Sequence, residues 1–435
     1  MSQLFSQRSR HSTWRKLWFF LAQSEKELGV ETITAKALEE MEAHLIVTDS
    51  DFEVARIEEK TRRHDVMAHI YAYSIVAPSA AGIIHYGATS CFVTDNTELI
   101  LMRDALDLLL SRIAKVLQNL TTFALKWKAE PTLSWTHLQA AQPAQWAQDL
   151  MFDLENIEQV RESLKFRGAQ EDVNSDIYSF GGNSAKCDEL NKLLCQKANF
   201  KDCYVDLMVA NAVAGLGATA QKICGDIRHL ANWKEIEEPF ESTQIGSSAM
   251  AFKRNPMRSE RIYSLSRELL SKPLNFANTL SDQWSVSGDK TMERTLDDSA
   301  VRRIDIPEMF LLADAILLGL DNVTDGLVVY PKRIRSRVQE ELPFMIAESI
   351  RVLSHEAGYA VKDEGKPNDL VARMKNTEFF KPIWHELDDM LRPELYIGRS
   401  VEIVERFCGE GGILQEKLKR YKDSIEKSTA ADLNV

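Results

Sequence analysis

The sequence predicts an all-α protein built from long helices, and three observations lead to this prediction. Glycine and proline supply only 19 and 12 of the 435 residues, which leaves few chain breakers. Apolar residues recur every three or four positions throughout residues 96–126, the spacing of one helix face. No sustained alternation of apolar and polar residues, the pattern of a half-buried strand, occurs anywhere in the chain.

Residues 1–89 are expected to form a first domain of shorter helices. The patterning predicts one helix over residues 13–28 and a second over residues 35–44. The region ends in the glycine-containing stretch GIIHYGATS, which reads as a turn before the long helices begin.

Residues 90–329 are expected to form a central domain of long helices. Over residues 96–126 the apolar stripe comprises Leu99, Met102, Leu106, Leu109, Ile113, Val116, Leu120 and Phe123. A helix of about thirty residues is roughly 45 Å long. Similar patterning covers 145–166, 205–234, 257–282 and 299–322, with a kink predicted at Pro273 in the third of these. Helices of this length usually pack side by side, so we expect a bundle.

Residues 330–435 are expected to form a third, again shorter-helical domain. The predicted breaks in this region are Pro343, Gly365, Pro367, Pro382 and Pro393. The chain contains no repeat, low-complexity tract or flexible linker that would suggest another architecture.

Charge and cysteine content exclude several function classes. The 53 basic and 65 acidic side chains give a net charge of −12, which would repel a nucleic-acid backbone. The six cysteines form no C-x-x-C pair and no zinc-type spacing, which favours a reduced chain. The most apolar window, residues 309–320, contains Asp314 and is too short to span a bilayer. We therefore expect a cytoplasmic protein with neither a nucleic-acid nor a membrane partner.

Residues 245–261, IGSSAMAFKRNPMRSER, carry the most unusual cluster of chemistry-bearing side chains. A Gly-Ser-Ser turn is followed by five cationic or amide side chains, namely Lys253, Arg254, Asn255, Arg258 and Arg261. Pro256 is suited to the first turn of a helix. Free backbone N–H groups, a helix N-terminus and fixed cations together suit an anionic substrate and would stabilise a serine alkoxide. The alternative is a solvated basic helix start preceded by a flexible linker.

Three histidines lie in polar, turn-like surroundings, namely His64 in RRHDVMAH, His85 in GIIHYGATS and His137 in SWTHLQ. An imidazole in such a place can act as an acid or base near neutral pH, although a single histidine is more often structural. His64 and His69 are five residues apart, a poor spacing for one helix face, so they are not expected to bind a metal.

A third cluster, ERTLDDSAVRR at 293–303, surrounds Ser299 with Arg294, Arg302 and Arg303 at the expected start of a helix. Its alternative explanation is an ion-pair cluster with Asp297 and Asp298 on the surface.

Together these segments resemble the fumarase/aspartase superfamily and, within it, the adenylosuccinate lyase family. GSSAMAFKRNP at 246–256 is similar to the superfamily loop Gly-Ser-Ser-x-Met-Pro-x-Lys-x-Asn-Pro and departs from it only at Ala251. RHDVMAH, GIIHYGATS, the TH-x-Q loop, EEPFE at 237–241, RSER and ERTLDDSA match the narrower family in its order over nearly the whole chain.

The resemblance implies a β-elimination that breaks a C–N bond and releases fumarate from a succinyl-amino group. The implied substrates are adenylosuccinate, which gives AMP, and the succinyl-carboxamide ribotide of purine synthesis, which gives the carboxamide ribotide. The resemblance also implies a homotetramer, in which the long helices form the core and three subunits build each active site. No metal and no organic cofactor is implied.

The resemblance also assigns roles to residues. Ser247 becomes the general base and His137 the general acid, with His64 assisting or positioning the substrate. The other matched positions would bind substrate or support the loop that does so; they are Asp65, His85, Thr89, Ser90, Thr136, Lys253, Asn255, Glu260, Arg294, Ser299 and Arg303. Lys253 and Asn255 would hold the succinyl carboxylate, while Arg294, Ser299 and Arg303 would face the phosphate or ribose.

The sequence departs from the family mainly in its loops. THLQAAQPAQWAQDL lacks a Thr-Thr-x-Gly-Lys-Arg element, AQEDVNSD replaces a Lys-Gly-Thr-x-Gly-Thr loop, and SVSGDKT is additional. The N-terminal Arg-Tyr element is not recognisable, and the segment after ELPFM is short. Either the chain has been joined across missing residues or its loops are truly shortened, and the intact mass distinguishes the two. Two other functions stay open: another superfamily lyase, such as argininosuccinate lyase, or an inactive homologue with a structural or interaction role.

Overall fold

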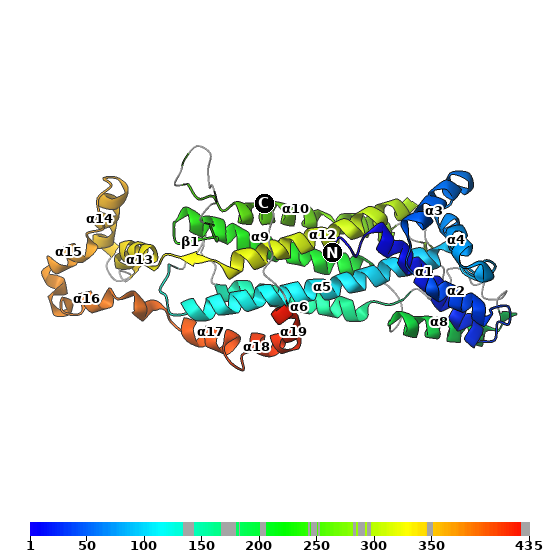
Figure 1. The fold of residues 1–435 in the computed structure, drawn as a ribbon. Coiled ribbons are helices and arrows are strands. Elements are labelled where there is room, and N and C mark those ends of the chain that lie inside the picture. Colours follow the sequence, from blue (N-terminus) through cyan, green and yellow to red (C-terminus); the bar gives the residue numbers. More distant parts are fainter. Residues whose placement is uncertain are drawn as a thin grey trace. The chain divides into compact units, whose positions relative to one another are not determined.

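The computed structural model describes residues 1–133, 143–166, 180–181, 183–200, 206–241, 244, 250, 253–281, 284–285, 292–293, 297–345 and 351–427. Helices dominate this part of the chain (Figure 1). The α-helices are α1 Gln7–Glu27, α2 Ala35–Ala43, α3 Asp49–Arg62, α4 Asp65–Val76, α5 Ser90–Trp127, α6 Pro143–Ser163, α8 Ser184–Ala198, α9 Asp206–Asn232, α10 Met257–Ser271, α11 Pro273–Ser281, α12 Asp297–Asp325, α13 Pro331–Met345, α14 Arg351–Lys362, α15 Leu370–Lys375, α16 Leu387–Met390, α17 Ser400–Cys408, α18 Ile413–Leu418 and α19 Lys422–Lys427.

Strands are short and scarce in the described residues. β1 Ile236–Glu237 pairs with β4 Val328–Val329, and β2 Trp284–Ser285 pairs with β3 Met292–Glu293, both antiparallel. Four 3-10 helices complete the list: η1 Pro78–Ala80, η2 Glu378–Ile383, η3 Pro393–Tyr396 and η4 Lys419–Tyr421. The all-α prediction is confirmed.

The helix starts near the N-terminus follow from local capping. The Ser6 side chain accepts a hydrogen bond from the Ser9 N–H, so α1 begins before the predicted start at residue 13. Thr48 and Asp51 form a reciprocal capping box at the start of α3. At α4 the capping residue is His64, whose ring accepts from the Met67 N–H. One of the predicted site residues is therefore also a helix cap.

The long helices follow the predicted stretches closely. The apolar stripe of 96–126 lies on α5, and Leu106, Ile113 and Leu120 are fully buried. Pro273 begins α11 after a one-residue turn, so the predicted kink is a complete break. The prediction of a break at Pro343 was wrong, because α13 continues to Met345. A proline removes only the helical hydrogen bond from its own nitrogen, and a helix can continue past it, as α12 also does past Pro307.

The chain groups into two compact units, each made of discontinuous segments. Unit 1 comprises Met1–Leu110, Asp153–Gly217 and Glu268–Asp314, and unit 2 comprises Ser111–Phe152, Ala218–Arg267 and Ala315–Val435. Helices α5, α6, α9, α10 and α12 contribute residues to both. The division of the chain into three consecutive domains, residues 1–89, 90–329 and 330–435, stays a prediction.

Each unit has its own buried side chains. In unit 1 an aromatic-rich core includes Trp14, Trp18, Tyr73, Phe92 and Phe166. In unit 2, α12 packs so closely on α10 that a Cβ at Gly319 would lie 2.7 Å from the Ile262 side chain. This close approach helps to fix α10, which follows the predicted substrate-binding loop.

Candidate active site

Four predicted site residues, Thr136, His137, Ser247 and Arg294, lie outside the described residues. Their roles stay predictions. The ten predicted site residues that the structure describes form two groups. The group in unit 1 contains His64, Asp65, His85, Thr89, Ser90, Ser299 and Arg303, and the group in unit 2 contains Lys253, Asn255 and Glu260.

In unit 1 the structure brings together the start of α4 and the start of α12. The Arg303 guanidinium lies 2.9 Å from the Asp65 carboxylate. Burial acts to raise the pKa of Asp65, but the Arg303 charge and the hydrogen bond from the Val66 N–H outweigh it and hold this pKa below its ordinary value. Asp65 is therefore a carboxylate at neutral pH and fixes the position of the arginine head group.

His64 stands beside this ion pair. Its Nδ1 atom accepts a hydrogen bond from the Met67 N–H at 3.5 Å and lies 3.8 Å from the Asp65 carboxylate. Because Nδ1 accepts, the proton of the neutral ring is on Nε2. With a side chain 48% exposed, His64 can present this N–H to a substrate.

A layer of charges behind the Asp65–Arg303 pair was missed by the sequence reasoning. Glu98 on α5 lies 2.9 Å from Arg302 and 3.8 Å from Arg10, and Asp95 lies 3.6 Å from Arg302. Arg302 and Glu98 are nearly fully buried, so their charges are screened little by water. The only sequence signal was the arginine pair at 302 and 303, which cannot reveal partners from α1 and α5.

His85 has a structural contact of its own. The Trp18 indole N–H donates to its Nδ1 atom at 3.1 Å, which again places the neutral proton on Nε2. Burial, helped by the nearby His64, lowers the pKa of His85 to about 4. His85 is thus a neutral donor at physiological pH and not a candidate for the charged acid.

Thr89 and Ser90 lie where the glycine turn leads into α5. Among the described residues, the Thr89 hydroxyl oxygen is buried and has no hydrogen-bond partner. An unmatched buried hydroxyl is costly, and a ligand oxygen would satisfy it. Ser299, on the first turn of α12, is half-buried and belongs to the same unit as Arg303.

In unit 2 the group of Lys253, Asn255 and Glu260 occupies the entry to α10. Lys253 is exposed, and its backbone N–H bonds to the Met250 carbonyl at 3.1 Å. The Asn255 carbonyl accepts from the Met257 N–H at 2.8 Å, and the Pro256 carbonyl accepts from the Glu260 N–H at 2.9 Å. The backbone after Lys253 is therefore already ordered as a helix start.

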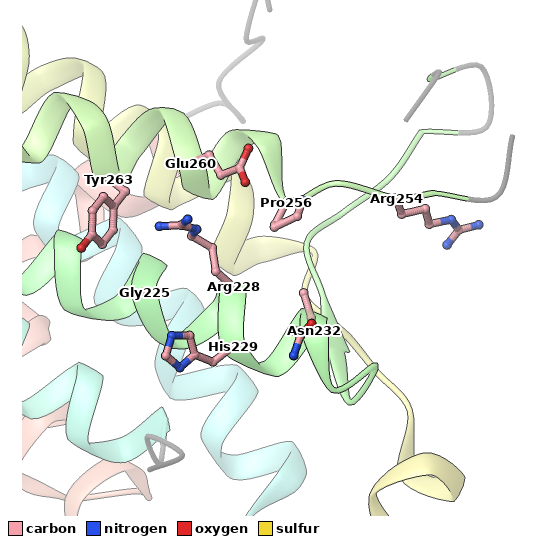
Figure 2. A pocket seen from close by; sticks show the side chains of 9 residues that line it. Gly225, Arg228, His229, Asn232, Arg254, Pro256, Glu260 and Tyr263 are labelled. Carbon is pink, nitrogen blue, oxygen red and sulfur yellow. The ribbon is translucent and has the colours of Figure 1, made fainter. Parts of the chain in front are cut away.

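Beside this helix start is a pocket of about 400 Å³ between the end of α9 and the first turns of α10. Figure 2 shows Glu260, Arg228 and Tyr263 lining it, with the Arg228 guanidinium 5.0 Å from the centre of the Tyr263 ring. Arg254, nearer the loop, pairs with Glu237 at 3.3 Å. The pocket combines two guanidinium groups with one carboxylate.

The described residues contain no group of three or more histidine, cysteine or acidic side chains arranged to hold a metal ion. Within the same residues, no helix is long and apolar enough to cross a membrane.

Comparison with known proteins identifies the family. A family model described as "Lyase" matches residues 1–270. The adenylosuccinate lyase of Schizosaccharomyces pombe is 46% identical over 98% of this chain and 94% of its own length. That of Saccharomyces cerevisiae is 45% identical over 94% and 91%. The solved structure of the 3-carboxy-cis,cis-muconate lactonizing enzyme from Pseudomonas putida shares the fold, with a TM-score of 0.77, 19% identity and 97% of each chain covered.

The match to the lyase family model shows that the chain belongs to the fumarase/aspartase superfamily of lyases, and the solved structure shares its helical fold. Within the superfamily it belongs to the adenylosuccinate lyase family. The resemblance stated from the sequence is confirmed, whereas the roles of individual residues are not tested by these similarities.

The comparison also shows that this chain lacks positions that a relative has. The alignment with the S. pombe protein spans 463 positions, more than the 435 residues of this chain. At least 28 positions, the difference between these two numbers, must therefore face gaps in this chain.

Proposed function

We propose that the chain eliminates fumarate from adenylosuccinate and from the succinyl-carboxamide ribotide, with Ser247 as base and His137 as acid. Ser247 would take the proton next to the succinyl carboxylate, forming an aci-carboxylate, and His137 would protonate the leaving nitrogen. The C–N electron pair leaves with the nitrogen as the double bond of fumarate forms. Side chains supply all of this chemistry, without a metal or an organic cofactor.

The observation that carries this proposal is the similarity to adenylosuccinate lyases over 98% of the chain. The structure adds support at Lys253 and Asn255, which stand immediately before α10. A lysine cation and a side-chain amide held at a helix start can bind a carboxylate, and they stabilise an aci-carboxylate more because it carries additional charge.

The nucleotide end of the substrate is assigned to the unit 1 group. Arg303, held by Asp65, would bind the phosphate together with Arg294 and Ser299, since a guanidinium makes two parallel hydrogen bonds to phosphate oxygens. His64, His85, Thr89 and Ser90 supply further donors, and Thr136 and Glu260 complete the proposed site.

We further propose that the protein is a homotetramer with active sites shared between subunits, located in the cytoplasm. The proposed oligomer is supported by an exposed apolar stripe on α12. This stripe is formed by Val301, Ile304 and Leu311, of which Ile304 is 62% exposed. Leu274 on α11 is 68% exposed. Exposed aliphatic side chains at helical spacing are typical of an interface. Light scattering should give about four times 49.4 kDa, and Ile304→Glu should lower that mass.

The test of the proposed reaction is fumarate release from adenylosuccinate, measured for the wild type, Ser247→Ala and Ser336→Ala. Ser336 is an exposed hydroxyl on α13 and serves as the matched control. Wild type and Ser336→Ala should release fumarate, whereas Ser247→Ala should lose at least 99% of the rate. Equal rates for all three would exclude Ser247 as the base.

A second candidate function is that of an inactive homologue that acts by binding other molecules. It is favoured by the alignment gaps and by Ala251, the one departure from the superfamily loop. It predicts a tetramer that releases no fumarate and does not bind AMP. The other open alternative, argininosuccinate cleavage, has no observation in its favour beyond the shared loop.

A further inference from the structure

We call residues 242–253 the Ser247 loop. The segment that precedes this loop is held by two contacts to residues that follow α12. Ile236 pairs with Val329 in the short β1–β4 ladder. Glu235, which is 2% exposed, lies 2.5 Å from the Arg337 guanidinium on α13. These contacts hold the backbone of residues 235–237 against the region that follows α12.

The next residue, Glu238, bonds across the loop to the start of α10. One carboxylate oxygen accepts the Arg258 N–H at 3.0 Å, and the other accepts the Ser259 N–H at 3.0 Å and the Ser259 hydroxyl at 2.9 Å. Glu238 is 4% exposed and Ser259 is fully buried. A buried carboxylate therefore caps α10 from a residue that lies 20 positions before Arg258 in the chain, and not from the residue next to the helix.

Arg258 makes a second set of bonds between the same two segments. Its guanidinium donates to the Pro239 carbonyl at 3.2 Å and to the Glu241 carboxylate at 2.8 Å. It also donates to Asn322 on α12 at 2.8 Å. With the Arg254–Glu237 pair, these contacts tie residues 237–241 to residues 254–259.

We propose that Glu238 is a positioning residue for the lyase reaction, which joins the two ends of the Ser247 loop and sets where Lys253 and Asn255 stand. This inference rests on the proposed function. Residues 242–253 connect two segments that Glu238 holds together, so the loop has fixed ends whatever its own conformation.

The physical reason is the cost of ordering a loop. Holding both ends at a fixed separation removes conformations in which Lys253 and Asn255 are displaced from the carboxylate site. A displacement of about 1 Å is enough to lower a rate strongly, since the stabilising groups must be placed before charge develops. Loss of the cap should therefore reduce kcat more than it raises KM.

The test replaces Glu238 by Gln in the full-length protein. The amide keeps the shape and one acceptor, but its NH2 group faces an N–H donor of α10 and cannot accept from it. We expect kcat for adenylosuccinate to fall at least tenfold, with KM changed less than threefold. Hydrogen exchange in residues 253–262 should be faster than in the wild type.

The matched control is Asp51→Asn. Asp51 is also a buried capping carboxylate, which accepts from the Thr48 N–H and hydroxyl at 2.8 Å each, but it caps α3. This variant should lower thermal stability while leaving kcat within twofold. Equal losses of kcat in the two variants would show a general structural effect and overturn the positioning role.

The milder variant Ser259→Ala covers the case in which Glu238→Gln does not fold. It removes only the hydroxyl contact, and we expect a two- to fivefold lower kcat. Unchanged kcat in a folded Glu238→Gln or Ser259→Ala protein would overturn the proposal. A wild type without lyase activity would instead overturn the proposed function, and hydrogen exchange would then decide the anchoring role alone.

Discussion

Asp65 and Arg303 form an ion pair at 2.9 Å that joins the first turn of α4 to the first turns of α12. Both side chains remain partly exposed, at 29% and 41%. Pairs of this exposure add little to stability, about 0–1 kcal/mol. The pair therefore holds the Arg303 guanidinium in one position while one side of it stays accessible to a ligand.

Replacing Arg303 by Ala should weaken substrate binding without unfolding the protein. We expect KM for adenylosuccinate to rise at least tenfold, because a charged hydrogen bond to phosphate is worth about 1.5–3 kcal/mol. Steady-state kinetics and a melting curve measure the two effects. Arg335→Ala, which removes an exposed arginine paired with Glu394, is the control and should leave KM within twofold. An unchanged KM in Arg303→Ala would refute the assignment of Arg303 to the phosphate.

Glu25 should make the protein less stable as the pH rises. Its carboxylate is fully buried in α1, and burial raises its pKa to about 8. Between about pH 4.5 and pH 8 the folded state keeps a proton that the unfolded state has lost, so stability falls by about 1.4 kcal/mol per pH unit. The difference in unfolding free energy between the wild type and Glu25→Gln, measured by denaturant unfolding from pH 5 to pH 8, should change with this slope. Glu27→Gln, at an exposed position of the same helix, should keep the wild-type slope.

His69 should act in the opposite direction, making the protein sensitive to acid. Burial, together with the adjacent His11, lowers the pKa of His69 to about 3. The two rings stack with centroids 3.9 Å apart. Since the unfolded histidine takes up a proton near pH 6.5 and the folded one does not, stability is lost as the pH falls below that value.

His69→Phe keeps an aromatic ring in the stack and removes the titrating group. We expect a shallower loss of stability between pH 6.5 and pH 4, measured by thermal unfolding. His385→Phe, at a side chain 73% exposed, should follow the wild-type curve. A His69→Phe curve parallel to the wild type would show that other groups cause the acid sensitivity.

Asn119 should be a strong stability determinant in unit 2. Its side-chain amide donates to the Asp321 carboxylate at 2.8 Å and to the Asp321 carbonyl at 3.2 Å, and both residues are 7% exposed. Asn119→Ala leaves this buried acceptor without its donor, which costs about 1–3 kcal/mol. The midpoint of urea unfolding should fall accordingly, whereas Thr122→Ala, at an exposed position one turn along α5, should shift it little.

The apolar repeat of α5 was sufficient to predict its existence, because Leu106, Ile113 and Leu120 report directly which face is buried. The helix start was harder to predict, since Ser90 begins α5 several residues before the apolar stripe becomes regular. Pro343 was misjudged because a proline removes only one helical hydrogen bond and need not end a helix, as Pro307 inside α12 also shows. Periodicity cannot indicate that one long helix belongs to two units.

The candidate site was predictable where a motif is local. The sequence of GSSAMAFKRNP already places Lys253 and Asn255 at a helix start, and α10 begins at Met257. Glu98, Arg10 and Glu238 were not predicted, because their partners are distant in sequence and no periodicity or motif relates such residues. The family resemblance named EEPFE, but only the structure shows which of its carboxylates bonds to α10.

The discontinuous make-up of the two units has a consequence for how the protein is synthesised. Unit 1 needs residues up to Asp314, and unit 2 starts at Ser111 but ends with the last part of the chain. Neither unit can be completed when only half of the chain has been translated. The apolar faces of α5, α6 and α9 therefore leave the ribosome before the later helices that pack on them have been made. We therefore expect the apolar faces of unit 1 to need chaperones until Asp314 has been made, and those of unit 2 until translation is nearly finished.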